Sequence, residues 1–253
     1  MTEEKIPTGV KDLDLMLEGG VWKGINVLIK GGTGTGKTTL ALQFLVQGAR
    51  LGERGMYLSF EESSEQVVRY GSRFFPDLRS LIENGTIQII DFSLHNKLKS
   101  KTIEFGGRKV GVPEKDELDS VSYIEDRIFD IRGQTITRVV LDGLQTFATT
   151  FYDLSGKQDT EELRRTISRI MVLLKKENIT TYILSEERED EPDKYGFISF
   201  VVDGMLVLRV NESLDVRTLK IAKMRGVKHT LKPVGFKLAE GEGIQVTDHT
   251  HLV

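Results

Sequence analysis

A glycine-rich segment directly behind an apolar run constrains the fold of this chain more than any other feature of its sequence. Residues 31–38 read GGTGTGKT, which matches the pattern G-x-x-x-x-G-K-[ST], and the apolar run 25–29 precedes them. Glycines let successive backbone N–H groups point at phosphate oxygens, while the lysine adds a cation and the threonine hydroxyl can bind Mg²⁺. Residues 39–48 have helix-forming side chains with an apolar face. This order of strand, loop and helix predicts a P-loop that binds a nucleoside triphosphate.

The residues of this loop receive individual roles. We expect Lys37 to reach the β- and γ-phosphates and Thr38 to hold Mg²⁺. A glycine-rich turn with a stray lysine would explain the same letters, but a chance match in a chain of this length has a probability of about 1%. The other candidates for nucleotide binding are Gly31, Gly32, Thr33, Gly34, Thr35, Gly36 and Thr39.

Length and composition favour one large α/β domain over residues 1–253. A chain of 253 residues with 39% hydrophobic content can bury a sizeable core, and no linker divides it. The net charge of −3 gives no global basic field for nucleic acid, and no apolar stretch approaches the ~20 residues that a bilayer span needs. The first residues lack a basic and then apolar signal sequence, and cysteine is absent. We therefore expect a cytoplasmic protein without disulfides or thiolate metal sites.

Short apolar, β-branched runs alternate with helical patterns along the chain. This alternation predicts a mostly parallel, twisted sheet with helices on both faces. The expected strands are 25–29, 56–60, 86–90, 139–141, 181–184 and 205–210. Three helices are expected. One begins at a capping box at 63–66, and the other two cover 118–131 and 163–174. Residues 215–225 and 234–246 alternate around turns and predict a β-rich C-terminal end.

These patterns fail between residues 93 and 116. The stretch is rich in lysine, glycine and glutamate, and we expect a long loop or insertion with a hairpin around Gly106 and Gly107. Two interpretations stay open, because a solvated charged excursion and a contact with a substrate or partner would both have this composition.

Hydrolysis needs a second acid near Mg²⁺ and a group that orients or deprotonates the attacking water. Residues 138–142 read RVVLD, an apolar strand that ends in a carboxylate, so Asp142 is the candidate second Mg²⁺ ligand. Gly143 follows it, so the water-activating acid must come from another strand. Glu61 and Glu62 come directly after the strand 56–60, at the sheet edge where α/β proteins bind ligands. They would equally suit the positive end of the next helix, and both interpretations stay open.

Four segments together resemble the KaiC family of RecA-like ATPases. They are the P-loop, FEES at 60–63, LD at 141–142 and AKMRGVKH at 222–229. The opening IPTGVKDLD at 6–14, followed by Gly19 and Gly20, is similar to that family as well. The resemblance implies a RecA-like P-loop NTPase core that uses ATP and Mg²⁺. It also implies a homo-oligomeric ring, commonly a hexamer, with ATP at each subunit interface.

The resemblance also implies roles for single residues. Glu61 and Glu62 match the family's catalytic acids, and Lys223 and Arg225 match the K-x-R-G fingers that reach a neighbouring subunit's nucleotide. His229 matches a histidine near the nucleotide, although a surface histidine beside a lysine needs no role.

The chain departs from KaiC in two respects. KaiC has two such domains in tandem, whereas this chain has length for one. Of the Ser-Thr pair that is phosphorylated there, only Ser199 matches, and a phenylalanine follows it, which argues against an autokinase cycle.

The leading hypothesis is a slow Mg²⁺-dependent ATPase whose ring acts as a nucleotide-dependent switch toward an unknown protein partner. One alternative is a RecA-like DNA-dependent ATPase or recombinase, which the mild acidity of the chain disfavours. The other is a nucleotide-gated interaction module with weak autokinase activity, which would use residues 93–116 as its output.

Overall fold

The structure is a computed structural model that describes residues 4–92, 102–105, 108–111, 136–147, 160–187 and 196–247. The helices are α1 (Lys11–Met16), α2 (Lys37–Arg50), α3 (Ser64–Phe74), α4 (Leu78–Glu83), α7 (Thr160–Lys176) and α8 (Ile198–Val201). The first strands are β1 (Lys5–Ile6), β2 (Val21–Trp22), β3 (Asn26–Gly31), β4 (Arg54–Ser59), β5 (Ile87–Asp91), β6 (Thr102–Phe105) and β7 (Arg108–Gly111). The later strands are β8 (Ile136–Asp142), β9 (Thr180–Glu186), β10 (Gly204–Asn211), β11 (Val216–Met224), β12 (Val234–Ala239) and β13 (Gly243–Val246).

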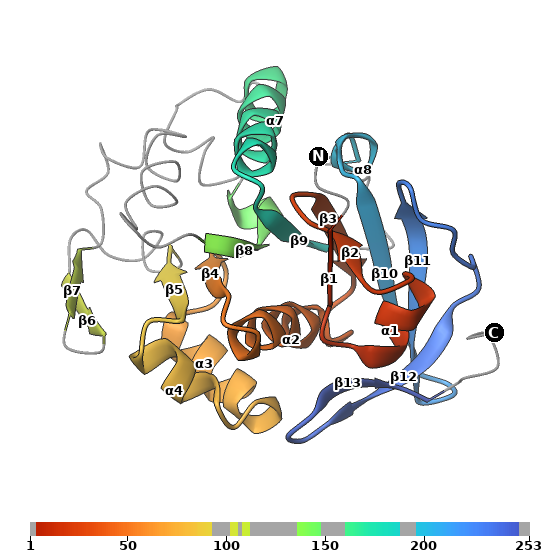
Figure 1. Cartoon of the computed structure of the whole chain (residues 1–253), viewed down its shortest axis with the longest axis horizontal. Coiled ribbons are helices and arrows are strands. Elements are labelled where there is room, and N and C mark those ends of the chain that lie inside the picture. Colours follow the sequence, from red (N-terminus) through yellow and green to blue (C-terminus); the bar gives the residue numbers. More distant parts are fainter. Residues whose placement is uncertain are drawn as a thin grey trace.

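One large sheet organises the fold, with nine strands in the order β13-β12-β11-β10-β3-β9-β8-β4-β5. The strands from β10 to β5 run parallel, whereas β11, β12 and β13 continue the sheet antiparallel. Helix α2 packs on one face together with α3 and α4, and α7 covers the other face (Figure 1). The predicted α/β class, the mostly parallel sheet and the β-rich C-terminal end are confirmed.

Both faces of the central strand β3 are buried, which explains its continuous apolar run. Side chains alternate between the faces of a strand. Val27 and Ile29 lie in the core under α2, while Leu28 lies in the core under α7. A parallel strand covered on both sides has no polar face to show in its sequence.

The predicted capping box at the start of α3 is present. Ser63 Oγ accepts a hydrogen bond from Gln66 N (3.3 Å), and Gln66 Oε1 accepts one from Ser63 N (3.1 Å). These two bonds satisfy backbone donors that the first turn of a helix otherwise leaves free. Helix α7 covers the predicted helix 163–174, whereas the predicted helix 118–131 lies outside the described residues.

Strands β6 and β7 pair antiparallel, with Thr102 opposite Gly111, so a hairpin forms within the 93–116 segment as predicted. Gly106 and Gly107 and the rest of this segment lie outside the described residues. Among the described residues, no helix is long and apolar enough to cross a membrane.

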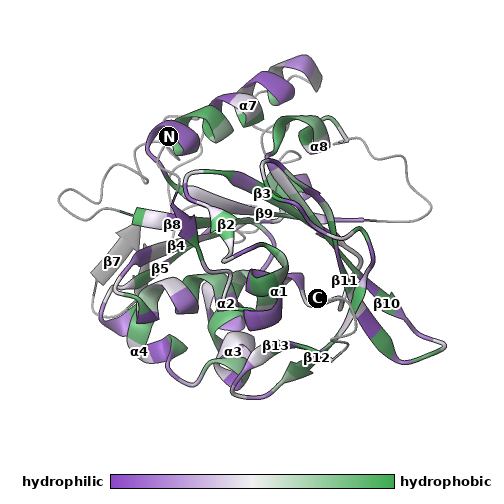
Figure 2. Ribbon diagram, turned by 45° about the vertical axis from the view of Figure 1, so that its right-hand side comes forward, coloured by the Kyte–Doolittle hydropathy of each residue, from purple (hydrophilic) through white to green (hydrophobic). Residues whose placement is uncertain are grey.

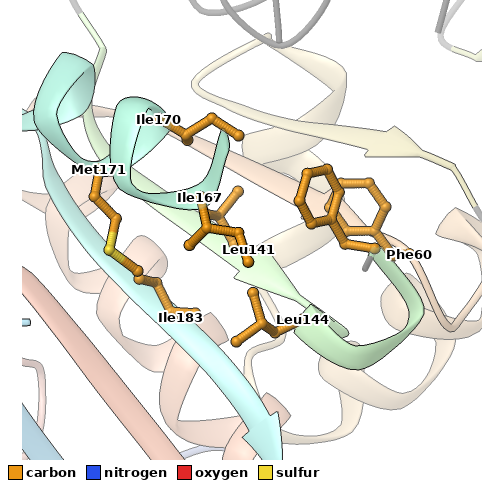
Figure 3. Close-up of a pocket in the computed structure, with 8 residues that line it drawn as sticks. Phe60, Leu141, Leu144, Ile167, Ile170, Met171 and Ile183 are labelled. Atoms are coloured by element: carbon orange, nitrogen blue, oxygen red, sulfur yellow. The ribbon is translucent and has the colours of Figure 1, made fainter. Parts of the chain in front are cut away.

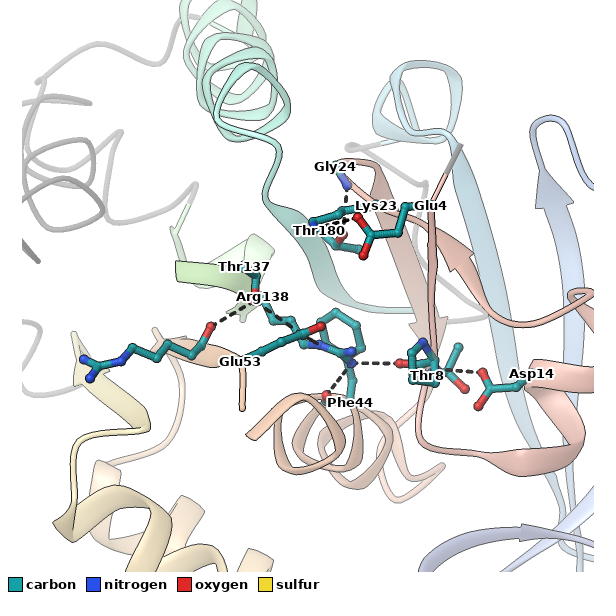
Figure 4. A network of polar contacts seen from close by, with 12 residues as sticks. Glu4, Thr8, Asp14, Lys23, Gly24, Phe44, Glu53, Thr137, Arg138 and Thr180 are labelled. Carbon is teal, nitrogen blue, oxygen red and sulfur yellow. Dashed lines mark hydrogen bonds and ion pairs between the residues drawn. The ribbon is translucent and has the colours of Figure 1, made fainter. Parts of the chain in front are cut away.

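A fully buried arginine connects the start of β8 to α2 and to the N-terminal segment (Figure 4). The Arg138 guanidinium pairs with the Glu53 carboxylate and donates from Nη1 to the carbonyl oxygens of Pro7 (2.7 Å) and Phe44 (2.9 Å). It also lies 4.5 Å from the Phe44 ring centroid. Gly48 makes room for it, since a Cβ there would be 2.4 Å from Arg138 Nε. One charged side chain therefore joins three segments that are distant in sequence.

Candidate functional site

The pairing register of the parallel strands brings the predicted site residues to one edge of the sheet. Gly31 at the end of β3 lies opposite Glu186 at the end of β9, and Asp142 at the end of β8 lies opposite Ser59 at the end of β4. Glu61 and Glu62 follow Ser59 directly. The carboxyl ends of parallel strands are where ligands bind in α/β folds. This edge therefore places four carboxylates, those of Asp142, Glu186, Glu61 and Glu62, near the P-loop and its lysine.

The backbone of the loop explains why glycine is needed at particular positions. Gly34 and Gly36 have φ angles of 73° and 100°, in the left-handed region that other residues rarely adopt. At Gly31, a Cβ would lie 2.6 Å from the carbonyl oxygen of Leu208 on the neighbouring strand β10. Close backbone packing and left-handed turns together hold the loop open at the N-terminus of α2, which suits an anion.

Lys37, the predicted phosphate ligand, is bonded to the loop itself. Its Nζ donates to the carbonyl oxygens of Gly31 and Gly32, both at 2.8 Å. Burial lowers the pKa of Lys37, against the attraction of Glu186, Asp142 and Glu61. The two carbonyls supply partners that bound phosphate oxygens could replace.

Asp142 is the most deeply buried carboxylate of this edge, with 6% of its surface exposed. The hydroxyl of Tyr57, a residue of β4, donates a hydrogen bond to Asp142 Oδ2. Burial raises the pKa of Asp142 to about 7, and Glu61 and Glu62 add to the rise, while the bond from Tyr57 and the charge of Lys37 oppose it. This residue is therefore costly to ionise until a cation arrives.

We predict that Asp142→Asn stabilises the nucleotide-free protein, and by more at pH 8 than at pH 5. The pKa of Asp142 is about 7 in the folded chain and near 3.8 when unfolded. Between pH 3.8 and pH 7 the folded state holds up to one proton more than the unfolded state. The wild type therefore loses stability as the pH rises through this window. Asparagine cannot ionise, so urea unfolding without Mg²⁺ should show a gain of roughly 2–4 kcal/mol at pH 8, because each unit of pKa difference corresponds to about 1.4 kcal/mol.

Asp77 provides a control of opposite sign. Its hydrogen bond and ion pair with Arg50 lower the pKa of its carboxyl group. Asp77→Asn should therefore lose about 0.5 kcal/mol at pH 8, because an exposed pair contributes little more. A difference between wild type and Asp142→Asn that is equal at both pH values would contradict the prediction.

Glu61 and Glu62 lie beside each other but have different surroundings. The Glu61 carboxylate accepts a hydrogen bond from Thr146 Oγ1 (3.2 Å) and packs on Gly143, where a Cβ would be 2.6 Å from Glu61 Cγ. Gly143 also has a φ of 93°. Burial raises the pKa of Glu62, with a further contribution from Glu61. The glycine after Asp142 thus makes the space that one of the two glutamates occupies.

Sequence reasoning missed Tyr57, Glu186 and Gln145. Glu186 Oε1 accepts a hydrogen bond from Thr33 Oγ1 of the P-loop (2.7 Å), and the Gln145 amide donates to the Glu186 carbonyl oxygen (2.7 Å). A glutamate that ends an apolar strand was the available signal for Glu186. For Tyr57 the signal was a hydroxyl in an otherwise apolar run.

Lys223 and Arg225 are not brought to this edge of the sheet. Lys223 Nζ donates to the carbonyl oxygens of Ser199 (3.0 Å) and Val202 (2.6 Å) at the end of α8. Arg225 donates to the Phe200 carbonyl oxygen (3.3 Å) and pairs with the buried Asp203 (3.5 Å). Burial lowers the pKa of Lys223, as does the charge of Arg225.

The remaining candidates, Thr39, His229 and Thr35, have local contacts among the described residues. Thr39 is buried within α2. His229 lies in the segment between β11 and β12, with Nδ1 at 3.1 Å from the Thr230 carbonyl oxygen. Thr35 Oγ1 donates to the Gly32 carbonyl oxygen (2.9 Å) and so helps to shape the P-loop.

An apolar hollow between β8, β9 and α7 lies next to this edge, and its empty volume is about 360 Å³ including the part open to solvent (Figure 3). It is lined by Phe60, Leu141, Leu144, Phe147, Ile167, Ile170, Met171 and Ile183. These side chains offer no donor or charge for a phosphate, so the polar edge around the P-loop is the better candidate site.

Comparison with known proteins agrees with this geometry. A family model described as "ATPase: KaiC" matches residues 6–251. The chain belongs to the KaiC family. This membership indicates ATPase activity and nucleotide binding in general.

Curated KaiC relatives match along almost the whole chain. The circadian clock oscillator protein KaiC of Thermostichus vulcanus is 32% identical over 247 residues, which are 95% of this chain and 44% of that protein. The circadian clock protein KaiC2 of Synechocystis is 28% identical over 98% of this chain and 41% of that protein. The chain spans less than half the length of these relatives and corresponds to a single KaiC-type half-domain.

A solved structure has the same fold. A KaiC-like protein from the hyperthermophilic archaeon Pyrococcus horikoshii superposes with a TM-score of 0.74 at 27% identity, covering 97% of this chain and 99% of that one. The expected RecA-type P-loop fold is confirmed.

Proposed function

We propose that this chain is a Mg²⁺-dependent ATPase of one domain that works as a nucleotide-dependent switch in a homo-oligomeric ring, with each active site shared between neighbouring copies. The P-loop, Asp142 and the two glutamates come from one copy. Lys223 and Arg225 come from the next. A cytoplasmic location and an unknown protein partner belong to the same proposal.

The observation that carries this proposal is the distance of the two cations from their own P-loop. Lys223 pairs with Met205, which pairs with Leu28 on β3. This level is three residues before Gly31, or about 10 Å along a strand. Arg225 lies farther still from the P-loop. Its backbone N–H donates to the Asp203 carbonyl oxygen, and the Asp203 N–H donates to the carbonyl oxygen of Asn26 at the start of β3. The two cations thus lie near the amino ends of the parallel strands, away from the P-loop at the carboxyl ends, and are suited to the nucleotide of another copy.

The surface around these cations supports contact with a second copy. Helix α8 leaves Phe200 80% exposed and Val201 42% exposed, beside the carbonyl groups that hold Lys223 and Arg225. Figure 2 shows the apolar colouring of this short helix at the margin of the molecule. Adjacent exposed apolar side chains next to cations are typical of a surface that becomes buried on assembly.

The residues of one copy suffice to bind the nucleotide and to prepare the water. Backbone N–H groups of residues 32–38 surround the phosphates, and Lys37 moves from its two carbonyl partners to the phosphate oxygens. Glu61 or Glu62 accepts a proton from the water whose oxygen bonds to the γ-phosphorus while the bond to the ADP oxygen breaks. Arg225 and Lys223 of the neighbouring copy stabilise the charge that develops on the transferred group.

The donor set fits Mg²⁺. Thr38 and Asp142 offer hard oxygen ligands, and Mg²⁺ is commonly held by one or two carboxylates together with substrate phosphates. The described residues contain no group of three or more His, Cys, Asp or Glu side chains that could hold a metal by itself. The ion would therefore arrive with the nucleotide and supply charge neutralisation at the phosphates.

We predict that Arg225→Ala reduces ATP turnover by about a hundredfold, the cost of one lost charge-stabilising donor. The sharper test is a mixture. Arg225→Ala subunits retain the glutamates, and Glu61→Gln/Glu62→Gln subunits retain the arginine. Mixing the two inactive proteins should restore phosphate release, since some interfaces then combine an intact acid pair with an intact arginine.

Lys220→Ala, an exposed change on the same strand β11, is the matched control and should keep wild-type turnover. Gel filtration with and without Mg-ATP reports assembly. Normal hydrolysis by a monomeric Arg225→Ala protein, or a mixture no more active than its components, would overturn the shared site. The DNA-dependent recombinase and the interaction module with weak autokinase activity gain no support from the family match.

A further inference from the structure

Tyr57 lies at the centre of the predicted metal site, although no motif marks it. It is fully buried in β4, and its hydroxyl donates a hydrogen bond to Asp142 Oδ2. The Thr38 side chain is close enough to the same phenol to lower its pKa through a hydrogen bond. One side chain thus connects the two residues that are predicted to bind Mg²⁺.

The register explains how the phenol reaches this position. Tyr57 pairs with Val140, two residues before Asp142 on β8, so the three side chains share one face of the sheet. Helix α2, which begins at Lys37 and carries Thr38, covers this face. The ring packs in the core under α2 while the hydroxyl meets the polar edge.

We infer that Tyr57 is a positioning residue for the metal site, an inference that rests on the proposed Mg²⁺-dependent ATPase. The phenol occupies Asp142 Oδ2 and leaves Oδ1 as the oxygen available to a metal or to its water. Hydrogen bonds to a ligating carboxylate hold its orientation, and their loss typically costs about 10- to 100-fold in metal affinity. Phenylalanine would keep the packing of the ring but leave Oδ2 without this donor.

Tyr182 offers a matched control for the loss of a buried hydroxyl. It lies on β9 of the same sheet, is fully buried, and stacks on Phe44 of α2 at 4.0 Å between ring centroids. Its hydroxyl has no hydrogen-bond partner among the described residues. Tyr182→Phe therefore removes the same atom from the same face of the sheet without touching Asp142.

The test measures how the affinity for a fluorescent ADP analogue depends on Mg²⁺ concentration, so it does not depend on turnover. Tyr57→Phe should raise the half-saturating Mg²⁺ concentration about tenfold, while its affinity in EDTA stays within a factor of two of wild type. Tyr182→Phe should match wild type in both. Both variants keep their aromatic ring, and thermal unfolding followed by circular dichroism verifies that they are folded.

The outcomes separate this inference from the proposed function. A wild type that binds the analogue equally well with and without Mg²⁺ would overturn both. A Mg²⁺-dependent wild type together with an unchanged Tyr57→Phe variant would overturn the positioning role alone, and Tyr57 would then be a core residue whose hydroxyl is merely satisfied.

Discussion

Replacing Glu61 and Glu62 together with glutamine is expected to slow ATP turnover about a thousandfold while nucleotide still binds. General base catalysis by a positioned side chain contributes about 10²- to 10⁴-fold. Burial and the neighbouring Glu61 raise the pKa of Glu62, which makes this carboxylate a better proton acceptor than an exposed one. Phosphate release measures turnover, and fluorescence of an ATP analogue measures binding, which depends on the P-loop and should stay within a few-fold of wild type.

Glu65→Gln is the matched control, because Glu65 is an exposed glutamate in the first turn of α3. If the tandem glutamates served only the positive end of this helix, the double variant would keep its turnover and lose about 0.5–1 kcal/mol of stability, as Glu65→Gln would. Full activity in the double variant would require another acid. If the double variant is slow, the single variants Glu61→Gln and Glu62→Gln show which of the two carboxylates causes the loss of turnover.

Arg138→Met is expected to lower the free energy of unfolding by about 3–5 kcal/mol, the usual cost of breaking a buried ion pair from one side. The change removes the pairing with Glu53 and both hydrogen bonds to the carbonyl oxygens of Pro7 and Phe44. Urea unfolding measures it. The loss should also loosen the N-terminal segment, and faster backbone amide hydrogen exchange in residues 5–10 would report this.

A double-mutant cycle tests the buried pair itself. Glu53→Gln leaves the Arg138 charge buried without its carboxylate, whereas the combination with Arg138→Met removes both charges. The double variant should therefore be less destabilised than the sum of the two single changes. Arg73→Ala breaks an exposed pair with Glu240 and should change stability by no more than about 0.5 kcal/mol. Strict additivity in the cycle would show that packing, and not charge pairing, is the role of Arg138.

Most of the parallel sheet could be predicted because its strands are buried on both faces. Continuous apolar runs such as the one in β3, alternating with helical periodicity, have few other solutions than a doubly covered sheet. The capping box at Ser63 was equally readable, since its two hydrogen bonds join residues three positions apart. Local patterns of this kind carry their own structural signal.

The buried arginine was not predictable from local pattern. Arg138 begins the run that ends in Asp142, and its neighbours in sequence do not show that Glu53, Phe44 and Pro7 converge on it. A charge in a core depends on partners from distant segments, so only the folded chain reveals whether it is paired.

The sequence by itself determined the family and indicated the candidate site residues. The P-loop, Asp142 and the tandem glutamates are short motifs whose spacing reflects backbone geometry within one loop or one strand end. Only the tertiary structure decided how they combine. Strand register places Tyr57 against Asp142 and Glu186 against the P-loop, and it holds Arg225 on the opposite edge of the sheet. Register depends on pairing between segments that are distant in sequence, such as Val27 on β3 and Gly204 on β10, and no local pattern encodes it.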